Sequence, residues 1–587
     1  MFKLLKNLTK KDILAIIISF IFIIVQVWLE LKMPDYMTKI TDLVMTDGSK
    51  ISDILVQGGY MLLCAFGSLL SSVLVGYLIA RMSANFSKNT RKKLYDKVIS
   101  FSIAEIKKFN TSSLITRTTN DITNIQMFIS MGLQLMIKSP IMAIWAITKI
   151  LNRGIEWSIA TAIAIVFLAM VILIIVIKVL PKFKIVQNLI DNINELTREN
   201  LTGIRVIRAF NAEKYQEDKF NKSNEELTSL QKYTQRFMSI LSPSIYSTMN
   251  LLTLAIYVIG ASLISSAGLT NKISIFSDMV VFSSYAMQVI MSFLMLAMMF
   301  IFYPRASVSA KRINEVLDTK PSIKSGNINK SENEKIGEIE FRNVSFKYPD
   351  SEEYVLNNIS FKANKGDTVA FIGSTGSGKS TLINLIPRFY DATEGEILID
   401  GVNIKDYKLS TLYDKLGYVP QKAIMFDGSI KDNVAYGKKD NYKFTDEKIN
   451  KAIKIAEAEE FVSKMEDKEN SHIASGGTNL SGGQKQRLAI ARAIAREPEI
   501  YIFDDSFSAL DYKTDFNLRQ NLKKYTKDAT CIIVAQRIGT IMNADTIVVL
   551  DNGKVVGLGK HEDLMKNCEV YQEIAYSQLS KEELENE

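Results

Sequence analysis

Cysteine and histidine are scarce in this sequence, and their scarcity excludes several kinds of site. Only three of the 587 residues are cysteine and two are histidine. Cys64, Cys531 and Cys568 lie far apart and without a zinc-binding spacing, so we expect reduced thiols rather than a disulfide framework. His472 and His561 have no metal-ligating neighbours at the usual spacings.

Glycine and proline are nearly absent from two long polar segments, which argues against coil there. Segments 81–132 and 178–236 are rich in charged residues, and we expect them to form helices. At about 1.5 Å per residue, half of either segment reaches roughly 35–40 Å beyond the apolar run beside it. Such helices would stand out of a membrane as stalks.

Long uncharged apolar runs are confined to the first 305 residues. A run of about 18 or more apolar residues is long enough to cross a bilayer as a helix. We expect six spans, and in the third Lys138 is expected to snorkel or to face the interior of the bundle. The expected spans are Ile13–Leu29, Ile54–Ala80, Leu133–Leu151, Trp157–Ile177, Phe237–Asn271 and Met279–Pro304.

The N-terminus is basic, but no cleavage pattern of small residues follows the first span, which argues against a signal peptide. With this end in the cytoplasm, the inside segments contain 24 Lys and Arg and the outside segments contain 6, in line with the positive-inside rule. The net charge of +8 arises from basic residues beside spans and not from a basic stripe with aromatics. We therefore expect contact with membrane lipid and no nucleic acid.

The sequence divides into a transmembrane domain (1–318), a polar linker (319–336) and a second domain (337–587). The second domain begins with strand-like sequence at Ile339–Lys347, and from Thr368 apolar strands alternate with helical stretches. This alternation predicts a parallel α/β core. The predicted fold is an α-helical six-span transmembrane domain with long cytoplasmic helical extensions, fused to an α/β P-loop domain.

A phosphate-binding loop opens the α/β core. The apolar strand Thr368–Ile372 runs into the sequence GSTGSGKS, and a helix is expected to follow. This order of strand, loop and helix is highly specific for nucleoside triphosphates. Glycines let backbone N–H groups surround the phosphates, Lys379 neutralises them, and Ser380 offers a hydroxyl to Mg²⁺. The residues expected to bind ATP in this loop are Gly373, Ser374, Thr375, Gly376, Ser377, Gly378, Lys379, Ser380 and Thr381.

A second apolar strand, Ile500–Asp504, ends in a carboxylate. In a P-loop ATPase a carboxylate at this position holds Mg²⁺, directly or through water. We therefore expect Asp504 and Ser380 to share the metal.

A third motif, LSGGQ at Leu480–Gln484, resembles the signature sequence of the ATP-binding cassette (ABC) ATPases. The resemblance covers the whole chain. It implies that Ser481, Gly482, Gly483 and Gln484 act in trans, on the γ-phosphate bound by the other cassette of a dimer.

The same resemblance implies roles for four further residues. Tyr348 would stack on adenine, and Gln421 would sense the γ-phosphate and the metal. Asp511 would lie in the loop that crosses the dimer interface. Ser475 stands where exporters often carry Glu, so coupling between the two sites through this position is in doubt.

Two positions depart from the family pattern. Asp505 stands where hydrolysing sites carry Glu to polarise the attacking water, and Gln536 stands where they carry His. Displacing a catalytic group by about 1 Å can cost on the order of 10² in rate. An amide can donate to a phosphate but cannot relay protons as imidazole does. We expect a site that binds ATP well and hydrolyses it slowly.

A complete signature beside a weakened site predicts a heterodimer. The partner would be a second ABC half-transporter with Glu and His in its own site. It would present an altered signature to Tyr348, Lys379 and Asp505 of this chain.

Six spans ahead of one cassette resemble the ABC exporter half-transporters, and the weakened site resembles that of one subunit in heterodimeric bacterial multidrug exporters. Segments Ser113–Asp121 and Glu199–Phe210 resemble stretches near the coupling helices of this class. The resemblance implies ATP-driven export across the bacterial plasma membrane. The alternatives are an ATP-gated channel or regulatory subunit, a homodimeric exporter with slow hydrolysis, and an importer built on the exporter fold.

The substrate is less well defined by the sequence. A hydrophobic drug, a lipid or a peptide would suit this class, although no protease domain precedes the first span, which counts against a peptide-processing exporter. Six methionines of the last span suit either a cavity for varied apolar ligands or ordinary packing. These are Met279, Met287, Met291, Met295, Met298 and Met299. Glu30 and Asp35 could gate the outer side or bind cations, but we expect ordinary interfacial charges.

Overall fold

The computed structural model describes residues 2–6, 8–46, 48–151, 153–329, 336–437 and 443–578. The chain separates into two compact units. The helical unit comprises Met1–Ile99 and Thr111–Thr319, and the α/β unit comprises Ser100–Asn110 and Lys320–Glu587. The predicted domain limits stay a prediction, and residues 330–335 of the predicted linker lie outside the described residues.

Every described element of the helical unit is a helix. In chain order they are α1 (Phe2–Leu5), α2 (Lys10–Met45), α3 (Ile51–Ile99), α5 (Thr111–Thr118), α6 (Asn120–Met127), the π-helical turn η1 (Phe128–Gly132), α7 (Leu133–Leu151), α8 (Ile155–Thr202), α9 (Ile204–Ala209), α10 (Glu213–Ser266) and α11 (Leu269–Asp318).

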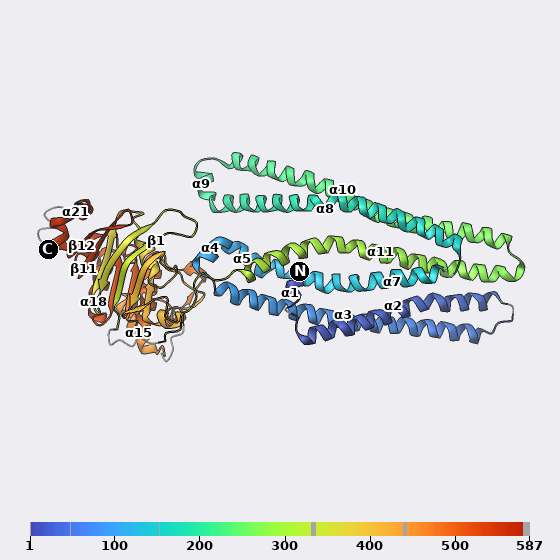
Figure 1. Ribbon diagram of the computed structural model, residues 1–587, viewed down its shortest axis with the longest axis horizontal. Coiled ribbons are helices and arrows are strands. Elements are labelled where there is room, and N and C mark those ends of the chain that lie inside the picture. The colour runs from blue at the N-terminus through green and yellow to red at the C-terminus, as the bar shows by residue number, and fades with distance from the viewer. Residues whose placement is uncertain are drawn as a thin grey trace. The chain divides into compact units, whose positions relative to one another are not determined.

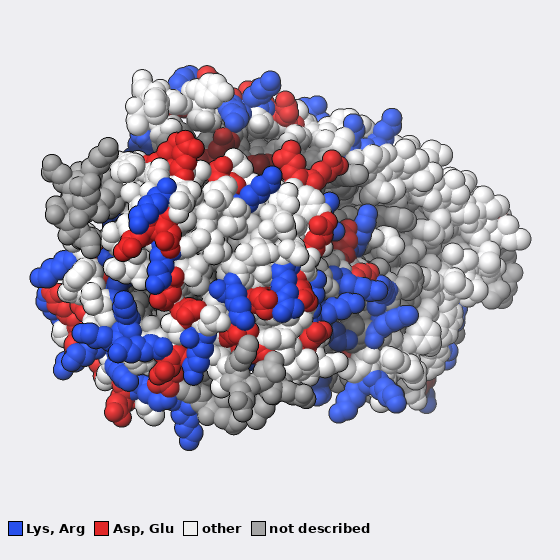
Figure 2. Space-filling model, turned by 60° about the vertical axis from the view of Figure 1, so that its left-hand side comes forward, with Lys and Arg blue, Asp and Glu red and all other residues white. Residues whose placement is uncertain are grey.

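Six helical stretches of this unit are long and apolar enough to cross a membrane, which confirms the six predicted spans. The least regular of these predictions, the third, matches α7 at both ends. Lys138 faces the interior of the bundle, because its ammonium group lies 2.9 Å from Glu30 Oε1. In Figure 2 the surface at the right, away from the α/β unit, is largely free of charged side chains.

The long polar segments are helical, as predicted. Helices α3, α8, α10 and α11 contain 49, 48, 54 and 50 residues. At 1.5 Å per residue each is roughly 70–80 Å long, against a hydrocarbon thickness of about 30 Å. Figure 1 shows α8 and α10 running beside each other to the short helix α9. The excess length forms the predicted stalks.

Asp35 is part of an internal ion-pair network, so the expectation of an ordinary interfacial charge is wrong for this residue. Its Oδ2 accepts from Lys149 Nζ at 2.7 Å, and its Oδ1 accepts from Tyr285 Oη at 2.6 Å and Arg153 Nη2 at 3.2 Å. Arg153 also binds Asp278 at 2.7 Å. The Asp35 side chain is only 20% exposed. The network fastens α2, α7 and α11 to one another.

The α/β unit begins with a short helix contributed from between two spans, α4 (Ile103–Phe109). Its strands are β1 (Ile339–Phe346), β2 (Leu356–Ala363), β3 (Thr368–Gly373), β4 (Glu394–Ile399), β5 (Val402–Asn403), β6 (Leu416–Val419), β7 (Gly428–Ser429), β8 (His472–Ile473), β9 (Ile500–Asp504), β10 (Thr530–Val534), β11 (Thr546–Asp551) and β12 (Lys554–Gly559).

The remaining helices of this unit pack around the sheets. They are α12 (Lys379–Leu385), α13 (Leu409–Lys415), α14 (Ile430–Val434), α15 (Asp446–Ile455), α16 (Glu459–Ser463), η2 (Lys468–Asn470), η3 (Ser475–Gly477), α17 (Gly482–Ala495), α18 (Tyr512–Tyr525), α19 (Ile538–Ile541), α20 (His561–Asn567) and α21 (Glu569–Tyr576).

The core of this unit is a six-stranded sheet in the order β12-β11-β3-β10-β9-β6. All neighbouring pairs are parallel except β11 with β12, which confirms the predicted parallel α/β core. Strands β3, β9 and β10 are almost wholly buried and apolar, as strands covered on both faces must be. A separate antiparallel sheet has the order β2-β1-β4-β5.

Candidate functional site

Four predicted motifs meet at one edge of the six-stranded sheet. The P-loop follows β3, Gln536 follows β10, Asp504 and Asp505 follow along β9, and Gln421 follows β6. These strands are adjacent and parallel, in the order β3-β10-β9-β6. Parallel strands present their carboxyl ends at the same edge, where ligands of open α/β sheets bind. Strand order therefore assembles the candidate site.

The glycines of the P-loop allow a close approach of backbone to backbone. Gly376 and Gly378 have φ of +87° and +98°, a region that L side chains rarely adopt. A Cβ on Gly373 would collide with the carbonyl oxygen of Leu550. The loop can therefore hold its N–H groups around an anion at the start of α12, where the helix dipole favours negative charge.

Lys379 lies at the centre of this loop. Its Nζ donates to the carbonyl oxygens of Gly373 at 2.8 Å and Ser374 at 2.7 Å. Burial lowers the pKa of Lys379, and the nearby carboxylates of Asp505 and Asp504 oppose that shift. A cation in this position is suited to a polyphosphate.

The donor set fits ATP with Mg²⁺. Ser380 Oγ donates to Asp504 Oδ1 at 2.9 Å, so a hydroxyl and a carboxylate oxygen lie together at the mouth of the P-loop. Hard oxygen ligands of this kind are those that Mg²⁺ prefers. Burial raises the pKa of Asp504, and the hydrogen bond from Ser380 acts in the opposite direction. When bound, Mg²⁺ would neutralise charge that develops on the terminal phosphates.

Asp505 is held by two amides. Its Oδ2 accepts from Gln536 Nε2 at 2.9 Å and from Gln421 Nε2 at 3.2 Å. Its backbone φ is +46°, an uncommon value outside glycine. Burial raises the pKa of Asp505, against the effect of hydrogen bonds from Gln421 and Ser508. The structure thus brings together the two positions that depart from the family pattern, with the predicted sensor Gln421 beside them.

Tyr348 lies at the P-loop helix, and an aromatic group surrounds it. Its hydroxyl is 3.0 Å from Thr381 Oγ1. Its ring makes edge contacts with Phe346 and Tyr390 at centroid distances of 5.0 and 5.3 Å. Lys107 of α4 lies over the Tyr348 ring, with Nζ 5.3 Å from the centroid.

The sequence interpretation missed α4 as part of this unit. Ile103 and Ala104 pack against the core of the α/β unit, and Glu105 accepts a hydrogen bond from the backbone of Ser322 at 3.1 Å. The coupling segment had been placed at Ser113–Asp121, which instead belongs to the helical unit. The signal was present as a capping box, Ser102-x-x-Glu105, which marks a new helix start.

Replacing Tyr348 with alanine should weaken ATP binding on the order of 10-fold, since base–aromatic stacking contributes about 1–3 kcal/mol. Tyr348→Phe keeps the ring and should bind within twofold of the unmodified chain. Titration of the full chain with a fluorescent ATP analogue measures both. Tyr354→Ala, at an exposed tyrosine of the same unit, is the control and should change nothing. Unaltered binding by Tyr348→Ala would contradict the stacking role.

The signature residues lie apart from the P-loop at the start of α17. Ser481 is the N-cap: its Oγ accepts from Gln484 N at 3.3 Å, and Gln484 Oε1 accepts from Ser481 N at 2.8 Å. Ser481 and Gly482 are exposed. Asp511 is likewise an exposed N-cap, of α18, and its hydrogen bond from Thr514 N lowers its pKa. These groups face outward, toward what would be a second cassette.

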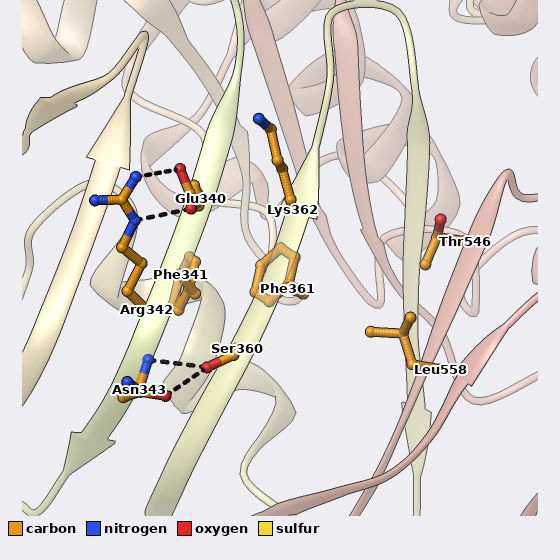
Figure 3. Close-up of a pocket in the computed structure, with 9 residues that line it drawn as sticks. All are labelled: Glu340, Phe341, Arg342, Asn343, Ser360, Phe361, Lys362, Thr546 and Leu558. Atoms are coloured by element: carbon orange, nitrogen blue, oxygen red, sulfur yellow. Dashed lines mark hydrogen bonds and ion pairs between the residues drawn. The ribbon is translucent and has the colours of Figure 1, made fainter.

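The largest hollow on the surface of the α/β unit is remote in sequence from every motif. Its volume is about 600 Å³, and it is lined by Glu340, Phe341, Arg342, Asn343, Ser360, Phe361, Lys362, Thr546 and Leu558. Figure 3 shows that its polar groups bind one another: Arg342 pairs with Glu340, and Ser360 with Asn343. It therefore offers little to a ligand.

The comparisons with known proteins agree with this geometry. Residues 16–320 match the family model described as the ABC transporter transmembrane region, and residues 356–508 match the one described as ABC transporter. The chain is 34% identical over 569 residues to the uncharacterised ABC transporter ATP-binding protein YfiB of Bacillus subtilis, covering 96% of each chain. It is 37% identical over 521 residues to an uncharacterised ABC transporter ATP-binding protein of Mycobacterium tuberculosis, covering 89% of this chain and 87% of the relative.

Two further likenesses concern a transported lipid and the fold. An ATP-dependent lipid A-core flippase of Haemophilus influenzae is 32% identical over 541 residues, covering 88% of this chain and 89% of the flippase. A solved structure of a bacterial Atm1-family ABC exporter with ATP bound has a TM-score of 0.81 at 24% identity. That match covers 96% of this chain and 98% of the exporter, and it shows the fold. The chain belongs to the ABC transporter family, as a half-transporter with the exporter fold and an ATPase cassette, and is a multi-pass protein of the bacterial plasma membrane.

Proposed function

We propose that this chain is one subunit of a heterodimeric exporter that moves a hydrophobic or amphipathic substrate, of the multidrug type, out of the cell. One contrast supports the proposal. Asp505 and Gln536 both depart from the family pattern and are bonded to each other at 2.9 Å, whereas the LSGGQ motif is complete and exposed. The chain's own site would hold ATP with little turnover, and Ser481–Gln484 would complete the site of its partner.

Two observations bear on the partner and the substrate. Helix α9 exposes apolar side chains that a second chain could cover, with Val206 60% and Phe210 78% exposed. The partner would carry Glu and His in its own site and an altered signature. The lipid A-core flippases among the relatives favour an amphipathic lipid or a drug of similar character as the substrate.

ATP turnover by the purified full chain, alone and with its partner, tests this proposal. Alone, the chain should bind ATP but hydrolyse it slowly, and Asp505→Asn should lower the rate less than twofold. With the partner, turnover should rise at least 10-fold and should drive substrate into inside-out vesicles. Ordinary turnover by the chain alone, abolished by Asp505→Asn, would instead indicate a homodimeric exporter.

A further inference from the structure

A second group of polar residues lies deep in the helical unit, apart from the ATP site. Glu30 of α2 and Lys138 of α7 form an ion pair at 2.9 Å, with side chains 18% and 14% exposed. Glu30 precedes the end of α2 at Met45 by 15 residues, and Lys138 precedes the end of α7 at Leu151 by 13. The pair therefore lies roughly 20 Å from those helix ends. Glu30 is not the interfacial charge that the sequence suggested.

Polar side chains from two more helices meet this ion pair. Glu30 Oε1 accepts from Gln26 Nε2 at 2.9 Å and from Ser68 Oγ at 3.2 Å, in addition to Lys138. Gln288 Nε2 reaches the backbone carbonyl of Glu30 at 3.5 Å. Helices α2, α3, α7 and α11 thus converge here. We name these five residues the amide cluster.

The amide cluster contains unused hydrogen-bonding capacity. Within the described part of the chain, Gln26 Oε1 and Gln288 Oε1 are buried and have no hydrogen-bond partner, and Gln26 is only 4% exposed. Each amide is fixed in orientation, because its Nε2 donates to an oxygen of Glu30 and a flipped amide would place two oxygens together. Lys138 uses one of its three N–H donors on Glu30. Spare acceptors and spare donors therefore face the same place.

The Asp35 network provides a contrast, five residues further along α2. Both of its carboxylate oxygens have donors, from Lys149, Arg153 and Tyr285. That network is complete in itself and acts as a fastening. Buried polar groups left incomplete destabilise a fold, so the amide cluster is better explained by a ligand that completes it.

We propose that the amide cluster is the head-group subsite of the transported substrate, and that it takes a neutral head group bearing hydroxyl or amide groups. The Glu30–Lys138 pair has no net charge, so a charged head would bring an uncompensated charge into a low-dielectric bundle. A hydroxyl or amide accepts from Lys138 and donates to Gln26 and Gln288. This inference rests on the proposed function, because it names the substrate class of that exporter.

Intrinsic fluorescence can test the subsite without a label. The chain has three tryptophans, Trp28, Trp145 and Trp157, all in the helical unit, and Trp28 is two residues from Glu30. The full chain in phospholipid nanodiscs, without nucleotide, is titrated with three amphiphiles that share an octyl tail. Octyl β-D-glucoside should give a saturable change, at least 10-fold tighter than octyltrimethylammonium or octyl sulfate.

Three leucine variants show whether the signal comes from the amide cluster. Gln26→Leu and Gln288→Leu should each weaken glucoside binding about 5- to 10-fold, because each removes one hydrogen bond to the head group. Gln57→Leu is the matched control, since Gln57 Oε1 is also buried without a partner. It lies on α3, 11 residues or about 16 Å from Ser68, and its affinity should stay within twofold. Thermal unfolding of each variant establishes that it folds.

Absence of saturable glucoside binding, an equal loss in Gln57→Leu, or tighter binding of octyltrimethylammonium would each overturn the subsite. The titration contains no ATP, so its result does not depend on hydrolysis or on the partner. Failure of ATP-driven transport into inside-out vesicles, with glucoside binding intact, would count against the proposed function alone.

Discussion

Gly482→Asp is expected to lower the ATP turnover of the assembled transporter by about 10²–10³, while this chain folds as before. Nothing lies within 4 Å of a Cβ built on Gly482, and an acidic residue in the first turn of α17 suits the helix dipole. The new carboxylate would, however, stand where the signature is expected to meet the γ-phosphate of the partner's ATP. Loss of one preorganised anion-binding contact typically costs about 10²–10³ in rate. Turnover of the purified complex measures the effect.

Thr445→Asp is the matched control. It places the same charge at the N-cap of α15, another helix start of the α/β unit, and turnover should stay within twofold. ATP affinity of this chain's own P-loop should be unchanged in Gly482→Asp, since the signature would act on the opposite site. A marked loss of that affinity, with turnover of the complex intact, would place the signature in cis and refute the trans assignment.

Features that depend on local composition were predictable from the sequence. The six spans and the helical stalks follow from long apolar runs and from polar segments without helix breakers, and α7 begins and ends where the sequence predicted. Strand β9 and the helix after the P-loop were likewise predicted, because each is bounded by residues with strong local preferences. Short-range physics decides these elements.

Features that depend on contacts between distant segments were not predictable in this way. The strand order β3-β10-β9-β6, which places Gln536 against Asp505, joins strands more than 100 residues apart. The partners of Glu30 and Asp35 lie on α7, about 110 residues away, so the sequence suggested interfacial charges where the structure has ion pairs. The packing of α4 in the α/β unit is a further example.

The double variant Asp505→Glu, Gln536→His is expected to raise ATP hydrolysis by the chain alone about 10- to 100-fold. Gln536 Nε2 and Gln421 Nε2 both bind one oxygen of Asp505, and the aspartate stem is one methylene short of the usual glutamate. Glutamate extends the carboxylate by about 1 Å toward the attacking water, and histidine adds a group that can relay a proton. Two copies of the variant would supply each other's signature, so both sites would be complete.

The positive φ of Asp505 sets a limit on this gain. A left-handed backbone costs a longer side chain about 1 kcal/mol more than it costs aspartate, which offsets less than a tenfold gain in rate. Each single variant should fall well short of the double, because residues that act as a unit are not additive. Asp505→Gln with Gln536→His has the same shape without the carboxylate and should show no gain. An equal gain in that control would mean that position 505 acts by shape rather than as a base, and the site's weakness would then lie elsewhere.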